Sequence, residues 1–234
     1  ALFGAQRAGV VVVNTNPLYT ARELEHQLKD SGAKAIVVLE NFAHTLEEVL
    51  PRTPVKTIVT TQIGDMFPAF KRMLTNLVVK HVKKMVPAWH LAQTTTFNDA
   101  LAAGRAQTLD DVSIRLDDLA FLQYTGGTTG VAKGAMLTQA NMVANLQQVG
   151  AWIARDLLDG KETTLIPLPL YHVFALTANL VFMKIGSHSI LVTNPRDLPA
   201  FIHLLKKTPI TAMIGVNTLY NGLLNAPGFA DVNL

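Results

Sequence analysis

Glycine, threonine and lysine gather in the segment from residue 125 to residue 134. The glycines let backbone N–H groups approach an anion, the threonine hydroxyls add donors, and the lysine adds a charge suited to polyphosphate. This composition is typical of a phosphate-binding loop, although a glycine-rich turn with incidental threonines would share it. The residues concerned are Thr125, Gly126, Gly127, Thr128, Thr129, Gly130, Lys133 and Gly134.

The order of these residues argues against a P-loop phosphotransferase. A Walker A loop places its lysine directly before serine or threonine, whereas Lys133 is followed here by Gly134. The loop follows an apolar run at 119–124 and precedes a helical pattern at 139–153. We therefore expect it to connect a strand to a helix.

Short β-branched runs alternate with helical patterns along the chain, which predicts an α/β fold with layered, mostly parallel sheets flanked by helices. Continuous apolar runs such as 35–39 indicate strands buried on both faces. We expect strands at 10–13, 35–39, 57–61, 119–124, 163–166, 189–192 and 211–214. We expect helices at 21–31, 42–50, 139–153, 174–184 and 198–207. Residues 1–9 are typical of the last part of a helix, and residues 85–118 form the least regular stretch.

At the glycine-rich loop the sequence resembles the adenylate-forming superfamily of acyl-CoA synthetases, luciferases and peptide-synthetase adenylation domains. The match runs from Tyr124 to Gly134, with Gly127 where most members have serine and Ala132 where most have proline. The glycine variant is similar to bacterial long-chain fatty-acid CoA ligases. The resemblance extends over essentially the whole chain, and it adds Tyr124 to the residues expected to bind the nucleotide.

The resemblance implies a two-step reaction. A fatty-acid carboxylate attacks the α-phosphate of ATP, pyrophosphate leaves, and coenzyme A then displaces AMP from the acyl-adenylate. ATP, Mg²⁺ and coenzyme A are the implied cofactor and co-substrates. In such a reaction loop donors stabilise the charge that develops on the phosphates. The implied catalytic residues are Lys133, Thr128 and His172.

A second segment, 167–174, is similar to the next motif of the superfamily. Its histidine, His172, is expected to position the substrate, and Phe174 is expected to form a wall of the acyl pocket. A lone histidine on an apolar segment can instead be a hydrogen-bonded core residue. Asn217 replaces a residue that is often proline in relatives that act on aryl acids, and it favours the fatty-acid branch.

Several family segments have no counterpart in the chain: the Tyr-Gly-x-Thr-Glu motif with its magnesium-binding glutamate, the ribose-binding aspartate, the hinge and the adenylation lysine. We therefore expect residues 1–234 to be part of one large N-terminal adenylation domain, inactive alone, with no metal ligand of its own. The start of that domain and the C-terminal domain are expected to lie outside the chain. Two alternatives stay open: the same chemistry on another carboxylate such as an aryl acid, and a noncatalytic nucleotide- or lipid-binding module.

The composition of the chain indicates its cellular compartment and argues against membrane spans. The chain has no cysteine and no signal-peptide pattern, so we expect a cytoplasmic protein without disulfides. The charge-free stretches 134–154 and 163–183 are interrupted by polar residues or proline, which disfavours membrane spans. A homodimer is an open alternative.

The whole positive excess of the chain comes from one segment. Residues 66–91 contain five lysines and arginines and no acid, while the net charge of the whole chain is +3. No nucleic-acid motif accompanies this charge, so we expect no nucleic-acid partner. From Met66 to Val86 apolar residues recur at helical spacing beside the lysines. This pattern predicts either a helix packed on the domain or peripheral contact with the cytoplasmic face of the inner membrane.

Overall fold

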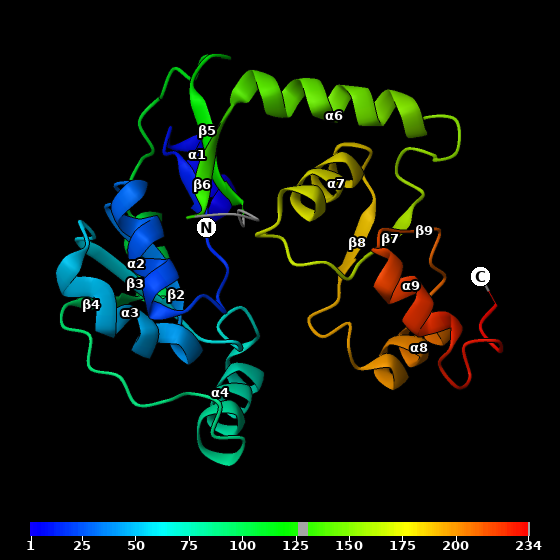
Figure 1. Ribbon diagram of the computed structural model, residues 1–234, viewed down its shortest axis with the longest axis horizontal. Helices are drawn as coiled ribbons and strands as arrows, with labels where there is room; N and C mark the ends of the chain where they lie inside the picture. Colours follow the sequence, from blue (N-terminus) through cyan, green and yellow to red (C-terminus); the bar gives the residue numbers. More distant parts are fainter. Residues whose placement is uncertain (126–130, 234) are drawn as a thin grey trace. The chain divides into compact units, whose positions relative to one another are not determined.

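Residues 1–125 and 131–233 are described by a computed structural model (Figure 1). The chain divides into two compact units, Ala1–Leu137 and Thr138–Leu234. Each unit contains parallel β-structure flanked by helices, which confirms the predicted α/β class.

One sheet of the first unit has the strand order β2-β3-β4. Its strands are β2 (Ala35–Leu39), β3 (Thr57–Thr61) and β4 (Thr94–Thr96). All three are parallel, with Ala35 beside Thr57 and Ile58 beside Thr94. The apolar side chains of β2 and β3 pack against the neighbouring helices, which buries Val38 and Ile58.

Short helices cover this sheet: α2 (Ala21–Asp30), η1 (Glu40–Phe42), α3 (Ala43–Val49), η2 (Leu50–Arg52) and α5 (Phe97–Arg105). The first turn of α2 is fixed by a capping box in which Thr20 and Glu23 each bond the other's backbone N–H. Leu24 and Leu28, one turn apart, face the same side and join Leu46 in the core. Burial of each such leucine contributes about 1.5–3 kcal/mol.

The other sheet of this unit has the order β1-β5-β6. It consists of β1 (Val12–Asn14), β5 (Leu119–Thr125) and β6 (Lys133–Thr138), and α1 (Leu2–Arg7) leads into β1. Strands β1 and β5 are parallel, with Asn14 beside Gln123. Because the two strands are parallel, their last residues, Asn14 and Thr125, lie at the same edge of the sheet.

The second unit contains the sheet β8-β7-β9. Its elements, in chain order, are α6 (Gln139–Ile153), β7 (Thr163–Ile166), α7 (Val173–Lys184), β8 (His188–Leu191), α8 (Leu198–Lys207), β9 (Ala212–Met213) and α9 (Asn217–Leu224). The central strand β7 is parallel to both neighbours. Helices α8 and α9 pack together (Figure 1), and Leu165, Phe201 and Leu223 form the core beside them.

The basic segment forms helix α4 (Ala69–Leu77), which continues as a π-helical turn, η3 (Val78–Val82). Its apolar side chains lie at helical spacing as predicted, but they are exposed rather than packed on the unit. Phe70 is 74% exposed, Met73 62% and Leu77 51%. Within the described part of the chain, no helix is both long enough and apolar enough to cross a bilayer.

Most predicted elements form within two residues of their expected ends, and α1 confirms the helix expected at the start. Four elements were missed. The stretch expected to be irregular contains β4 and α5, because the threonines of β4 pair with β3. Strand β6 separates the glycine-rich loop from α6, because it pairs with β5. Helix α9 follows β9 where no helix was predicted.

Candidate functional site

The predicted phosphate loop crosses from β5 to β6. Gly126, Gly127, Thr128, Thr129 and Gly130 lie outside the described residues. Its described ends are Thr125, the last residue of β5, and Lys133 with Gly134, the first two residues of β6. The side chains of Thr125 and Lys133 are exposed. Two adjacent strands therefore hold the two ends of the loop.

Tyr124 anchors the first end of the loop. The residue is 7% exposed, and its hydroxyl donates a hydrogen bond of 2.5 Å to Oδ2 of Asp30, the last residue of α2. Burial, followed by the hydrogen bond to Asp30 and its negative charge, raises the pKa of the Tyr124 hydroxyl. Tyr124 therefore stays protonated and remains a donor at neutral pH.

His26 contacts the second end of the loop. Its Nε2 lies 2.8 Å from the carbonyl oxygen of Ala132. Because a carbonyl only accepts hydrogen bonds, this nitrogen is the donor. The imidazole also meets the Tyr124 ring edge-on, with ring centres 6.4 Å apart and planes at 84°. The same histidine thus touches residues on both sides of the loop.

Gly134 lies directly against Tyr124. A Cβ atom at position 134 would stand 2.9 Å from Cε2 and 3.0 Å from Cζ of the tyrosine ring. Carbon atoms in contact normally lie about 3.5–4.0 Å apart, so the ring occupies the space that a side chain would need. Glycine at 134 therefore lets the second end of the loop approach the first.

A buried amide ties α2 to the first strand of the same sheet. Gln27 is 1% exposed, and its Nε2 donates to the carbonyl oxygen of Asn14 over 3.0 Å. The Asn14 amide in turn donates to Oε1 of Gln123 over 3.3 Å. Helix α2, β1 and β5 are therefore linked immediately beside the loop.

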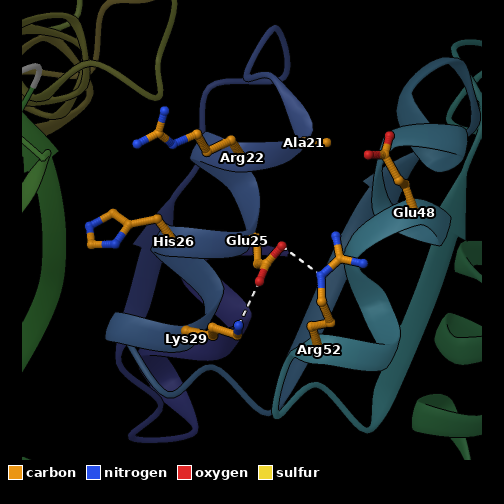
Figure 2. Close-up of a pocket in the computed structure, with 7 residues that line it drawn as sticks. All are labelled: Ala21, Arg22, Glu25, His26, Lys29, Glu48 and Arg52. Atoms are coloured by element: carbon orange, nitrogen blue, oxygen red, sulfur yellow. Dashed lines mark hydrogen bonds and ion pairs between the residues drawn. The ribbon is translucent and has the colours of Figure 1, made fainter.

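A charged hollow of about 340 Å³ opens on another side of α2, lined by Ala21, Arg22, Glu25, His26, Lys29, Glu48 and Arg52 (Figure 2). Glu25 bridges Lys29 at 2.5 Å and Arg52 at 2.7 Å, and these hydrogen bonds lower the pKa of its carboxyl. Figure 2 shows His26 leaving the helix away from Arg52. None of the predicted site residues lines this hollow.

In the second unit, His172 and Asn217 follow the carboxyl ends of the neighbouring strands β7 and β9. Because the strands are parallel, the two segments leave the same edge of the sheet. His172 caps α7 as an exposed residue, 6.0 Å from the Tyr171 ring, which removes the alternative of a core histidine. Phe174, the second residue of the same helix, is 54% exposed, and Asn217 is exposed at the start of α9.

Residues 1–233 match the family described as AMP-binding enzyme. The chain belongs to this family. The superfamily resemblance drawn from the loop is thereby confirmed over almost the whole chain.

Curated relatives of the chain include three that are named long-chain-fatty-acid–CoA ligase. The chain is 53% identical to that of Salmonella typhimurium over 234 residues, 52% identical to that of Haemophilus influenzae over 237, and 35% identical to that of Bacillus subtilis over 234. The first two alignments cover 100% of the chain and the third covers 99%. The chain spans only 42% of the first two relatives and 41% of the third.

Solved structures with the same fold include an anthranilate CoA ligase in complex with anthranoyl-AMP, with a TM-score of 0.77 and 21% identity. That alignment covers 100% of the chain and 40% of the ligase. A long-chain-fatty-acid–CoA ligase of Archaeoglobus fulgidus has a TM-score of 0.71 and 23% identity over 96% of the chain and 39% of its own. At these identities the likeness establishes the fold.

The contacts that α2 makes with the loop ends were not predicted from the sequence. His26, Gln27 and Asp30 were predicted only as part of a helix. In the structure His26 and Asp30 contact the two ends of the loop, and Gln27 contacts the neighbouring strand β1. Their one available signal is spacing, since His26 and Asp30 are four residues apart and share a helix face. Spacing alone did not indicate what that face contacts.

Proposed function

We propose that the chain is part of the large N-terminal domain of an ATP-dependent long-chain fatty-acid–CoA ligase. The observation that carries the proposal is the loop motif from Tyr124 to Gly134, within a chain that is 53% identical throughout to a curated ligase of that name. Position 127, glycine rather than serine, further supports the fatty-acid branch.

In the first step a carboxylate oxygen of the fatty acid attacks the α-phosphorus of ATP. The bond to pyrophosphate breaks, and the acyl-adenylate forms. Negative charge grows on the departing phosphates, so a cation and hydroxyl donors held near them lower the barrier. Lys133 and Thr128 are the residues proposed for this role, and the exposed position of Lys133 supports it. In the second step the coenzyme A thiol takes the acyl group and AMP leaves.

Magnesium is proposed to arrive bound to the phosphates of ATP. Among residues 1–125 and 131–233, no group of three histidine, cysteine, aspartate or glutamate side chains could hold a metal ion. Mg²⁺ commonly keeps several waters and binds through substrate phosphates and one or two carboxylates, so it needs no such group. When bound, it would neutralise part of the charge on the leaving pyrophosphate.

His172, Phe174 and Asn217 are proposed to contact the fatty acid. His172 would orient the carboxylate by a hydrogen bond, and Phe174 would offer an apolar surface to the chain. The exposed positions of all three at or near one edge of the β8-β7-β9 sheet support this assignment.

Carboxylate-dependent exchange between ATP and pyrophosphate tests the proposal. The full-length gene product is assayed with acetate, octanoate, palmitate, oleate and a cinnamate-type acid, and the Salmonella typhimurium relative serves as the control. We expect exchange to be fastest with palmitate or oleate. Exchange with the aryl acid alone would show that the protein activates aryl acids rather than fatty acids. No exchange with any acid would leave a noncatalytic binding module.

We also propose that α4 docks the protein peripherally on an anionic membrane at the cytoplasmic face. The exposed side chains Phe70, Met73 and Leu77 repeat at helical spacing, so one apolar stripe faces outward. Lys71 lies over the Phe67 ring, with its Nζ 4.5 Å from the ring centre. Apolar side chains flanked by lysines match the requirements of the bilayer interface.

Vesicle co-sedimentation tests this docking. Lys71, Lys83 and Lys84 are replaced by glutamate, while Lys80, which is paired with Glu40 at 3.7 Å, is left unchanged. Each basic residue near an anionic surface contributes about 1 kcal/mol, so losing one weakens binding roughly fivefold and reversing three weakens it more. We expect this loss on phosphatidylglycerol vesicles and little change on phosphatidylcholine.

The matched control reverses three exposed basic residues elsewhere in the first unit, Lys34, Lys56 and Arg105. A second variant, Phe70→Ser with Met73→Ser, should weaken binding to both kinds of vesicle, because it removes apolar rather than charged contacts. Equal binding by the original protein and by both variants of the segment 70–84 would refute docking through this segment.

A further inference from the structure

Helix α2 makes one contact with each end of the segment that crosses from β5 to β6. His26 donates a hydrogen bond of 2.8 Å to the Ala132 carbonyl, and Asp30 accepts one of 2.5 Å from the Tyr124 hydroxyl. His26 and Asp30 are four residues apart, so their side chains leave the same face of the helix. One helix face therefore holds the residue before the loop and the residue after it.

Two further contacts join these ends to each other. The Tyr124 ring packs on Gly134 at a separation that leaves no room for a Cβ atom. The His26 ring meets the edge of the same tyrosine. The two ends of the loop and one face of α2 thus form a single packed cluster.

Helix α2 is itself held in position by core packing and hydrogen bonds. Leu24 and Leu28 are buried in the core, and Gln27 bonds the backbone of Asn14. The capping box at Thr20 closes the first turn, and Arg52 pairs with Glu25 at 2.7 Å. Loop donors stabilise developing charge only when their positions are set before the reaction, which requires such a support.

We infer that His26 and Asp30 are positioning residues for ATP: by holding Ala132 and Tyr124, they fix the adjacent Lys133 and Thr125 for contact with the phosphates. The inference rests on the proposed use of ATP by this loop. Neither side chain needs to touch the nucleotide. Loss of either contact should therefore weaken ATP binding and leave the affinity for the fatty acid unchanged.

The test compares matched variants in the full-length gene product. His26→Leu and Asp30→Ala remove the contacts, and each should raise the KM for ATP about fivefold, the effect of losing one hydrogen bond of typical strength. His26→Gln keeps an N–H donor and Asp30→Asn keeps an oxygen acceptor, so both should restore most of the affinity. His44→Leu, an exposed histidine on α3, is the control.

The ratio of the KM for ATP to the KM for palmitate distinguishes a positioning role from simple destabilisation of the protein. A positioning role raises the KM for ATP with the KM for palmitate unchanged. The inference is overturned if the KM for ATP of His26→Leu and Asp30→Ala equals that of the original enzyme, or if both KM values rise together. It is also overturned if Tyr124→Phe and Asp30→Ala have additive effects on the KM for ATP, because a shared hydrogen bond requires non-additivity.

Calorimetric titration with ATP keeps this inference distinct from the proposed function. An enzyme that shows no exchange with any acid but still binds ATP refutes the ligase proposal, and the Kd for ATP then tests the two variants. A protein that neither exchanges nor binds ATP refutes both.

Discussion

Replacing Gly134 by alanine tests the packing of this residue against the Tyr124 ring. The added Cβ would lie 2.9 Å and 3.0 Å from two ring carbons of Tyr124 and 3.3 Å from its hydroxyl oxygen. The closest of these contacts is about 0.6 Å shorter than the lower limit of ordinary carbon contact. The ring has little room to move away, because it is 7% exposed and its hydroxyl is bonded to Asp30.

Overpacking of this kind costs about 1–3 kcal/mol of the free energy of unfolding. For a chain of this size each kcal/mol lowers the melting temperature by roughly 2–4 °C. Chemical and thermal unfolding of Gly134→Ala measure this cost. The matched control is Gly104→Ala in α5, which lies in the same unit and has nothing within 4 Å of the new Cβ. Alanine is favoured over glycine inside a helix, so the control should gain up to about 1 kcal/mol.

A double variant identifies the cause of the loss. When Tyr124→Ala removes the ring, adding Gly134→Ala should cost almost nothing further, which gives a large coupling energy between the two positions. If Gly134→Ala is as stable as Gly104→Ala, or if its cost is the same with and without the Tyr124 ring, the Tyr124 ring does not exclude a side chain at position 134.

Three other substitutions test other parts of the molecule. Lys133→Met should slow ATP–pyrophosphate exchange on the order of 10²-fold with an unchanged melting temperature, and an unchanged rate would contradict its proposed role. Leu46→Ala, at a fully buried position, should lower the free energy of unfolding by about 2–5 kcal/mol, and a loss near zero in denaturant titration would contradict its place in the core. The pKa of the Glu162 carboxyl is lowered because the Leu158 N–H and the Thr211 hydroxyl donate hydrogen bonds to the carboxylate. Its stabilisation is therefore present above the unfolded pKa of about 4.3 and is lost as the pH falls through the lower folded pKa. Glu162→Gln should reduce the melting temperature at pH values near neutrality and lose this effect in acid, whereas an equal difference at both pH values would exclude the ionised form as the cause.

Local sequence patterns predicted the elements whose own residues favour one secondary structure and mark both of its ends. Strands β2, β3 and β7 and helices α6 and α8 have the predicted ends. Their apolar runs are continuous or periodic, and proline, glycine or capping residues mark where each element begins or ends. Elements that depend on a distant partner were missed. Strand β4 is three threonines whose extended form is stabilised by pairing with β3, and no local pattern records that pairing.

The phosphate-binding role proposed for the loop follows from residue types alone, because the glycines, threonines and lysine between Tyr124 and Gly134 offer donors and a positive charge suited to an anion. The residues that support the two ends of the loop could be identified only from the folded structure. His26 meets Ala132 across 106 positions of the chain, and Asp30 meets Tyr124 across 94. Contacts over such distances follow from the packing of α2 beside β5 and β6, which no local spacing of residues encodes.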